Sequence, residues 1–280
     1  YPRWIKTSVS EEQKSINEIL RDQKIDASKY LFPKNPDILI AGCGTGQYVL
    51  ITASRFKNAR IFALDLSLSS IAYAQRKTDE IGISNVQYAQ ADINELSNLN
   101  RYFDCIESVG VLHHLKDPIK GWEILTKLLK PDGIMKIGLY SKIARQCVTE
   151  GRRLISDKGF ISSPQDIRRC RQDIILKAED GDPVFMNLLK FRDFYSLSEC
   201  RDLLFHVQEH QFSLPEIEAI LKALDLEFLG FEMSSQYSLQ NFTSSFKNHA
   251  LSPLNHWHEY ELKNPDIFRG MYQFWCKKIN

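Results

Sequence analysis

The feature that most constrains the fold is an apolar run over residues 37–41 that leads into three closely spaced glycines. These glycines are Gly42, Gly44 and Gly46. Glycines let the backbone turn tightly and approach a ligand, and the N–H groups at the start of a following helix attract negative charge. A second apolar run ends at Asp65. This acid lies roughly 20 residues after the glycines, where nucleotide-binding folds place the carboxylate that accepts hydrogen bonds from ribose.

The glycine spacing argues against a dinucleotide ligand. The dinucleotide fingerprint is G-x-G-x-x-G, whereas Gln47 stands in this chain where the last glycine would be. Nicotinamide or flavin binding is therefore disfavoured. A tight turn in some other α/β protein remains an alternative if the glycines are considered alone, since short motifs also match by chance.

The glycine segment resembles the first motif of the class I S-adenosylmethionine-dependent methyltransferases, which carry G-x-G-x-G after their first strand. Other segments match this family in the same order. Residues 86–92 are a predicted strand ending in an acid, residues 102–109 a fourth strand and residues 134–140 a fifth. Between the last two, an Asp-Pro pair at 117–118 predicts a helix start. The resemblance covers about half of the chain, and the order of its parts is its most specific feature.

The resemblance implies an α/β fold, a doubly wound Rossmann-like seven-stranded sheet in the order 3-2-1-4-5-7-6. Apolar runs at 226–231 and 271–276 are the expected antiparallel pair at the sheet edge, and residues 234–270 between them form a long excursion. The residues between the fifth strand and this pair have helical periodicity. They predict a mainly helical insertion.

We expect four parts in the chain. They are an N-terminal leader and helix over 1–30, a cofactor-binding Rossmann-like half over 31–140, a helical inserted lobe on the substrate side over 141–214, and a C-terminal helix and strand pair over 215–280.

Local signals place several helices within these parts. A capping-box pattern at residues 10–13 predicts a helix from there to about Asp22. In the insertion, Ser163 predicts one helix start, residues 197–207 predict an amphipathic helix, and Ser213 predicts the start of the helix that returns to the sheet.

The resemblance also implies the cofactor contacts. It places ribose on Asp65, adenine on Asp92 and Ile93, and the methionine end near the glycines and Ser108. The complete expected set is Gly42, Gly44, Gly46, Gln47, Asp65, Leu66, Asp92, Ile93, Ser108 and Val109, with S-adenosylmethionine as cofactor and S-adenosylhomocysteine as product.

One position departs from the family pattern. Many members carry an acid two residues before the first glycine, where it helps to hold the methionine amino group, whereas this chain has Ile40. We expect backbone carbonyls near Gly42 and Ser108, or a polar side chain such as Gln47, to hold that group instead.

Two histidines follow the predicted fourth strand directly. At that position His113 and His114 lie near the expected pocket mouth, where a neutral imidazole takes a proton from a hydroxyl or amine. They are the candidate catalytic residues, and simple packing is the alternative. Methyl transfer also proceeds by positioning alone, so a dedicated base is not required.

Residues 206–210 match H-x-x-E-H, the zinc pattern of inverted zincin peptidases. On a helix, histidines four residues apart share a face and reach one metal together. Methyl transfer needs no metal, so we predict no metal site. A hydrogen-bonded structural cluster is the favoured interpretation, and substrate binding by His206 or His210 is the alternative.

Residues 141–177 carry nine basic side chains against four acids, on a chain whose formal charge is only +1. A solvated helix face is the simplest interpretation. The more specific hypothesis is that Arg145, Arg152 and Arg153 attract an anionic acceptor, because guanidinium groups bind carboxylates and phosphates in a bidentate way.

Composition limits the setting and the partners. The charge gives no general drive toward nucleic acid or membrane, and no run approaches the roughly 18 apolar residues of a membrane span. Six scattered cysteines without a C-x-x-C pair indicate free thiols in a reducing compartment, and hence a cytoplasmic location. The expected partner is an unidentified acceptor, either a small molecule or a protein.

The chain begins at Tyr1, and residues 194–212 resemble a bacterial branch of these methyltransferases that is often fused to tetratricopeptide repeats. We therefore expect the chain to be part of a longer protein. Two alternatives to an active methyltransferase remain. One is a catalytically silent S-adenosylmethionine-binding or regulatory module, and the other is a nucleotide-sugar or dinucleotide enzyme.

Overall fold

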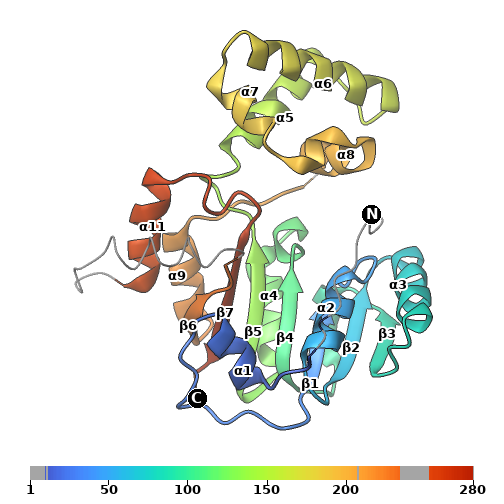
Figure 1. Ribbon diagram of the computed structural model, residues 1–280, viewed down its shortest axis with the longest axis vertical. Coiled ribbons are helices and arrows are strands. Elements are labelled where there is room, and N and C mark those ends of the chain that lie inside the picture. Colours follow the sequence, from blue (N-terminus) through green and yellow to red (C-terminus); the bar gives the residue numbers. More distant parts are fainter. Residues whose placement is uncertain (1–9, 11, 207, 234–251, 280) are drawn as a thin grey trace.

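The computed structural model describes residues 10, 12–206, 208–233 and 252–279. A seven-stranded sheet forms its centre, and a group of helices projects beyond one end of the strands (Figure 1). The strand order is β3-β2-β1-β4-β5-β7-β6, which confirms the predicted Rossmann-like fold. None of the helices in the described ranges is both long and apolar enough to cross a membrane.

The first five strands are paired in parallel, and β7, which lies between β5 and β6, pairs antiparallel with both. In chain order they are β1 (Asp37–Ala41), β2 (Arg60–Asp65), β3 (Val86–Gln90), β4 (Phe103–Val109), β5 (Leu129–Leu139), β6 (Leu226–Phe231) and β7 (Tyr272–Lys278). The carboxyl ends of the parallel strands therefore meet at one edge of the sheet. A ligand site is expected there, beside β1, where the direction of winding reverses.

Strand β5 begins earlier than the sequence predicts. Its pairing with β4 shifts between Phe103, which lies opposite Leu129, and Cys105, which lies opposite Ile134. The Pro-Asp-Gly turn at 131–133 is thus accommodated as an irregularity inside the strand, and Asp132 has a positive φ of 61°. The pairing of β5 with β4 therefore continues on both sides of this turn.

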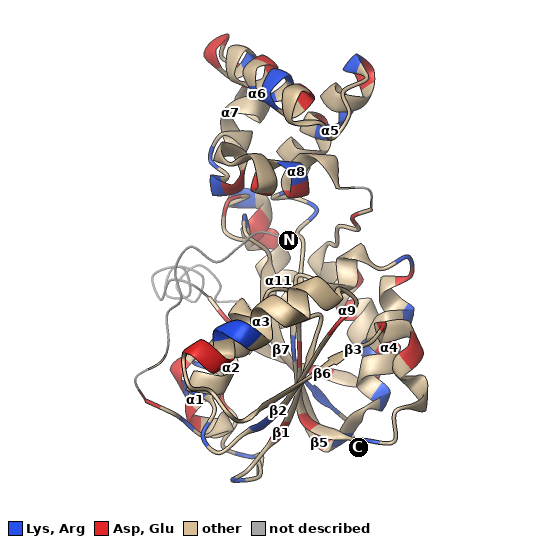
Figure 2. Cartoon of the chain, turned by 90° about the vertical axis from the view of Figure 1, so that its right-hand side faces the viewer, with Lys and Arg blue, Asp and Glu red and all other residues tan. Residues whose placement is uncertain are grey.

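Helices cover both faces of the sheet with separate apolar clusters. One face carries α1 (Ile16–Asp22), α2 (Gln47–Arg55) and α3 (Leu68–Glu80), and the other carries η1 (Ile93–Asn98), η2 (Leu112–His114), α4 (Pro118–Lys127), α9 (Leu214–Ala223) and α11 (Pro253–Lys263). Figure 2 shows the sheet edge-on between these layers. Of the excursion predicted over 234–270, residues 234–251 lie outside the described residues, and α11 belongs to the rest.

Helix α1 starts five residues later than the capping-box pattern at 10–13 predicts. The box that forms is Ser15 with Glu18: the Ser15 hydroxyl accepts the Glu18 N–H, and the Glu18 carboxylate accepts the Ser15 N–H. The backbone N–H of Ser10 is instead donated to the Ser54 hydroxyl on α2. Two similar patterns follow one another here, and the second forms the helix start while Ser10 contacts α2.

The projecting helices form a lobe with its own apolar core, of which Ile167, Ile174 and Phe194 are fully buried members. The lobe consists of α5 (Gln146–Lys158), α6 (Pro164–Glu179), α7 (Pro183–Leu188), η3 (Arg192–Tyr195) and α8 (Leu197–Phe205). The predicted caps Ser163 and Ser213 are confirmed. Helix α8, by contrast, ends at Phe205 instead of reaching residue 207. The division into four parts stays a prediction.

Two chain segments connect the lobe to the sheet and lie side by side. Phe212 donates its N–H to the carbonyl of Tyr140 at 2.9 Å, and Lys142 donates to the carbonyl of Phe212 at 2.8 Å. The side chain of Glu261, fully buried on α11, accepts hydrogen bonds from the hydroxyls of Ser141 and Tyr272. Burial raises the pKa of Glu261.

This raised pKa gives a stability prediction. Since the folded state holds the proton of Glu261 more tightly than the unfolded state, its contribution is lost as pH rises above the ordinary glutamate value of about 4.5. Glu261→Gln removes the ionisable group and keeps partners for both hydroxyls. We expect the free energy of unfolding to fall less with rising pH in this variant, measured by urea denaturation from about pH 5 to pH 8.

The exposed Glu259 on the same helix provides the matched control. Glu259→Gln should leave the wild-type slope unchanged. If the free energy of unfolding of Glu261→Gln changes with pH as steeply as that of wild type, Glu261 ionises in the folded protein without loss of stability.

Candidate active site

The glycine loop after β1 has the conformation that a close ligand contact requires. Gly42, Gly44 and Gly46 have φ values of 83°, 52° and 89°, in the left-handed region. A Cβ added at Gly42 would meet the side chain of Val111 at 2.4 Å, whereas one added at Gly44 would meet no atom within 4 Å. Gly44 therefore leaves open space beside the backbone, and any larger residue would be strained there.

Asp65, at the end of β2, fixes this loop. One of its carboxylate oxygens accepts the N–H of Gly44 at 2.8 Å, and the other accepts the N–H of Ser67 at 2.8 Å. A carboxylate has about four lone-pair sites, so each oxygen keeps one for a ligand. Asp65 is 6% exposed.

A cavity of about 500 Å³ opens in front of the loop, at the carboxyl ends of β1, β2 and β4. Eight of the ten predicted cofactor residues line it, namely Gly42, Gly44, Gln47, Asp65, Leu66, Asp92, Ile93 and Val109, together with Cys43, Thr45, Tyr48, Leu64, Ala91, Gly110, Val111, His114, Leu115, Tyr140, Asp202 and His206. The two exceptions are Gly46, which caps α2, and Ser108. The buried Ser108 hydroxyl donates to the carbonyl of Ala41 instead.

Ile40, which stands where many family members carry an acid, is part of the apolar core. Its side chain is 3% exposed and belongs to the apolar cluster under α1 and α2. The acid Glu107 is the register partner of Ile40 on β4. Its carboxylate accepts a hydrogen bond from the hydroxyl of Thr52 on α2, and burial raises the pKa of Glu107. Neither residue lines the cavity, whereas Gln47 does. Gln47 therefore remains the candidate for the cofactor amino group.

His113 does not fit a catalytic role. Its side chain is fully buried and stacks on Tyr140 with ring centroids 3.9 Å apart. Burial lowers the pKa of His113 to about 2, with the neighbouring His114 adding to the effect. A base that weak does not accept protons near neutral pH, and the ring does not line the cavity. These observations argue against His113 as the proton acceptor, and its catalytic role stays a prediction.

His114 lies on the cavity wall. Its Nδ1 is 3.0 Å from the carbonyl of Gln208, and its ring stacks on that of His206 at 4.1 Å. Burial lowers the pKa of His114. The ring is therefore neutral at pH 7, which is the state a proton acceptor needs.

Two of the three arginines predicted to bind an anion contact the same acid. Arg145 forms a bidentate pair with Glu209, at 3.0 and 2.7 Å, and Arg152 contacts the same carboxylate at 2.8 Å. Burial alone would raise the pKa of Glu209, but the two guanidinium groups hold it below its ordinary value. Neither arginine lines the cavity. Arg153 is 73% exposed and lies 3.8 Å from Glu150.

The described residues of the H-x-x-E-H segment, His206 and 208–210, are not helical. Because α8 ends at Phe205, His206 and His210 do not share a helix face, and the geometry assumed for a metal pair is wrong. Glu209 faces the two arginines, and His210 donates its backbone N–H to the carbonyl of His113. No group of metal-binding side chains occurs in the part of the chain that the structure describes.

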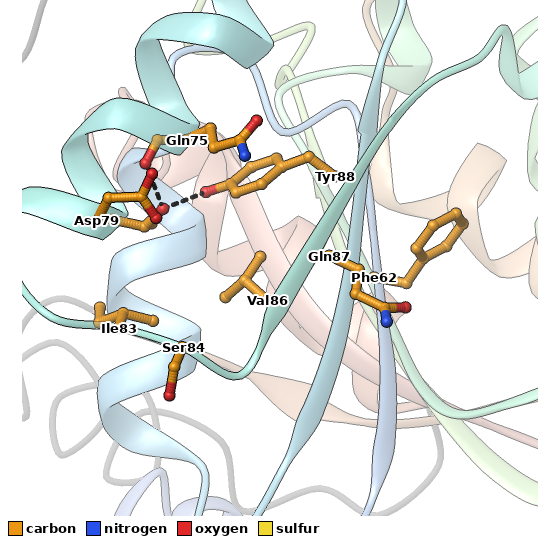
Figure 3. A pocket seen from close by; sticks show the side chains of 9 residues that line it. Phe62, Gln75, Asp79, Ile83, Ser84, Val86, Gln87 and Tyr88 are labelled. Carbon is orange, nitrogen blue, oxygen red and sulfur yellow. Dashed lines mark hydrogen bonds between the residues drawn. The ribbon is translucent and has the colours of Figure 1, made fainter.

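A second hollow, of about 460 Å³, lies at the free edge of β3 (Figure 3). Its wall includes Asp79 on α3 and Tyr88 on β3, whose hydroxyl reaches that of Thr78 at 3.5 Å. No glycine lies on its wall, and the strand ends that meet at the cavity are not part of it. Substitutions in this hollow therefore provide controls for substitutions in the cavity.

A family model described as methyltransferase domain matches residues 38–133. This chain carries a methyltransferase domain. It is 29% identical over 252 residues to an uncharacterised Synechococcus protein, covering 83% of this chain and 58% of that protein. It is 28% identical over 206 residues to malonyl-[acyl-carrier protein] O-methyltransferase of Acetivibrio thermocellus, covering 68% and 69%.

Among solved structures, PKMT2 from Rickettsia typhi is similar in fold, with a TM-score of 0.69 at 14% identity, covering 93% of this chain and 53% of that one. The same protein in complex with AdoHcy gives a TM-score of 0.68 at 16% identity, covering 88% and 49%. This likeness supports the fold. The chain spans little more than half the length of PKMT2 and of the Synechococcus protein.

The cavity fits the cofactor of this domain. Gly44 provides a cradle for close backbone approach, and Asp65 and Asp92 present carboxylates along the same wall. The predicted enzyme class, an S-adenosylmethionine-dependent methyltransferase, and its cofactor are thus confirmed at the level of the domain. The residue assignments within the cavity stay predictions.

Tyr140, Tyr48 and Asp202 are among the wall residues that the sequence analysis did not predict. Tyr140 follows the fifth strand directly, so the rule that ligands meet strand carboxyl ends was a usable signal for it. Tyr48 opens α2 beside Gln47, at the helix start that the glycine motif predicts. Asp202 lies on α8, far along the chain, and its sequence carries no signal for this position.

The role of Asp65 can be tested by Asp65→Ala. Removing a charged acceptor should weaken S-adenosylmethionine binding by about 1.5–3 kcal/mol, roughly 10- to 150-fold in Kd. Isothermal titration calorimetry measures this. Asp79→Ala, in the hollow of Figure 3, is the matched control and should bind as wild type. Unchanged affinity in a folded Asp65→Ala protein would exclude Asp65 from the cofactor site.

Proposed function

We propose that this chain transfers a methyl group from S-adenosylmethionine to an acceptor held between the sheet and the helical lobe. The observation that carries this proposal is the composition of the cavity wall. The glycine loop and the strand ends of the methyltransferase domain form one part, and Asp202 and His206 of the lobe form another. When bound, S-adenosylmethionine supplies an electrophilic methyl group on a sulfonium. The lobe residues then face the position where an acceptor enters.

The cofactor and acceptor occupy different parts of the wall in this proposal. Asp65 and Asp92, at the ends of β2 and β3, hold the adenosine. The aromatic residues Tyr48 and Tyr140 exclude water around the reacting group, which aids a positioned displacement. Burial raises the pKa of Tyr48 to about 12, so its hydroxyl stays protonated as a hydrogen-bond donor.

We infer that the reacting group of the acceptor is uncharged. None of the described residues that line the cavity is a lysine or an arginine. Arg145 and Arg152 both contact Glu209, so an anion that binds them would compete with this buried carboxylate. Arg153 is exposed and lies 3.8 Å from Glu150, and none of the three arginines lines the cavity. These contacts argue against an anionic acceptor.

The setting of the domain is also a proposal. We infer that it acts within a longer cytoplasmic protein, of the branch that carries tetratricopeptide repeats, on a small molecule or a protein. The 58% coverage of the Synechococcus protein supports a longer chain. The near-neutral charge supports an acceptor other than nucleic acid or a membrane lipid.

Binding and transfer should be measured separately. Calorimetry with S-adenosylmethionine should give saturable binding at one site per chain. Incubation with methyl-labelled S-adenosylmethionine and a bacterial extract should give labelled product, and Asp65→Ala should give far less. Saturable binding without any labelled product would support the catalytically silent module instead. Binding of NAD or a nucleotide sugar in preference to S-adenosylmethionine would contradict the proposal.

A further inference from the structure

The backbone of one residue, Gln208, contacts two histidines of the cavity wall. Its carbonyl oxygen is 3.0 Å from Nδ1 of His114, and its N–H is 3.2 Å from Nδ1 of His206. The two imidazole rings stack at 4.1 Å with an interplanar angle of 30°. Both histidines line the cavity, one from the methyltransferase domain and one from the lobe.

The first contact fixes the tautomer of His114. A carbonyl oxygen only accepts hydrogen bonds, so Nδ1 of His114 must carry the proton. In the neutral ring, Nε2 then has a free lone pair. Among the described residues no group donates a hydrogen bond to this Nε2. His114 is thus held as a proton acceptor.

The second contact fixes His206 in the opposite tautomer. A backbone N–H only donates, so Nδ1 of His206 must be the unprotonated nitrogen. Its proton therefore resides on Nε2. His206 offers an N–H donor to the cavity, next to the lone pair of His114.

Several contacts hold Gln208 in this bridging position. Its side-chain amide donates to the carbonyl of Leu115 at 3.3 Å. On its C-terminal side, Glu209 is clamped by Arg145 and Arg152, and the N–H of His210 is bonded to the carbonyl of His113 at 2.8 Å. The bridge therefore belongs to a segment that is anchored on both the sheet and the lobe.

We propose that His114 and His206 form an acceptor–donor pair, in which Nε2 of His114 takes a proton from the methyl acceptor and Nε2–H of His206 orients the same atom. The inference rests on the proposed function and narrows its substrate class. The acceptor atom must offer both a lone pair and a proton, as a hydroxyl or an uncharged amine does. A carboxylate has no proton to give, so it would gain nothing from this pair.

The proton transfer balances without another reactant. The acceptor atom forms its bond to the methyl carbon while its proton passes to Nε2 of His114. The electron pair of the broken carbon–sulfur bond stays on sulfur. The positive charge of the sulfonium is replaced by that of the imidazolium, whose Nδ1–H keeps its bond to Gln208. The proton then leaves to solvent.

The surroundings of His114 determine its pH response. The groups that face it are His113 from η2, Tyr140 directly after β5, His206 and Asp202 from the lobe, and the ion-paired Glu209. Burial is the largest influence and lowers the pKa of His114, whereas the carboxylates of Asp202 and Glu209 oppose it. Transfer should therefore stay maximal at neutral pH and fall in acid, as His114 becomes protonated.

Imidazole ¹⁵N NMR of the whole chain with S-adenosylhomocysteine bound tests the pair directly. Two-bond and three-bond correlations distinguish the two tautomers. We expect the Nδ1–H form for His114 and the Nε2–H form for His206. The same tautomer in both rings, or the Nε2–H form in His114, would overturn the proposal. Failure of S-adenosylhomocysteine to bind at all would instead count against the proposed function.

Replacing the two histidines by Asn or Gln distinguishes a structural role from a role in proton transfer. In His114→Asn the amide N–H replaces Nδ1–H toward Gln208, but the base is gone. We expect unchanged melting temperature and S-adenosylhomocysteine affinity, while labelling of the extract falls by about 10²- to 10⁴-fold, the usual range for a general base. His206→Gln keeps a donor near Nε2 and should retain more activity than His206→Asn.

His258→Asn on α11 makes the same chemical change away from the cavity and is the matched control. It should label as wild type. Labelling by His114→Asn within about fivefold of wild type would exclude His114 as a base, given the range above. Equal losses in the two His206 variants would exclude its donor role.

Discussion

The arrangement of the site depends on the buried ion pair between Arg145 and Glu209. The side chains are 3% and 1% exposed, they lie 64 positions apart in sequence, and the guanidinium also stacks on Tyr140 at 3.6 Å. A buried pair of this kind adds little net stability, because desolvation offsets most of the attraction, but breaking it costs several kcal/mol. Its main effect is therefore positional: it fixes the segment returning from the lobe against the end of β5.

The contacts of residues 208–210, in the segment that returns from the lobe to the sheet, account for the H-x-x-E-H pattern without a metal. Glu209 faces the arginines, while its neighbour Gln208 reaches the cavity side and bridges His114 and His206. Extended backbone sends successive residues to opposite sides, whereas a helix would have brought both histidines of the pattern to one face. The pattern thus serves anchoring and wall formation at once.

The cofactor half was predictable because its signals are local. Strand, glycine turn and acid follow one another within about 30 residues in a fixed order. Tyr140 could also have been inferred from its strand end. By contrast, Asp202 reaches the cavity only through the lobe, and the pairing of Arg145 with Glu209 has no sequence signature. The late start of α1 has the same origin, since a contact between Ser10 and α2 accompanies the choice of the second of two successive capping patterns.

The cofactor side and the acceptor side of the cavity are held by different parts of the chain, and this has a functional consequence. Asp65 and the glycine loop are held by contacts within the methyltransferase domain, whereas Asp202 and His206 depend on how the lobe docks. Changes in the lobe can therefore alter the acceptor side of the cavity while the cofactor side stays intact. The contact between Gln208 and His114 limits such changes. A shift of residues 208–212 would break the hydrogen bond that sets the tautomer of His114. In the proposed mechanism, acceptor binding and proton transfer are thus coupled through the backbone of one residue, Gln208.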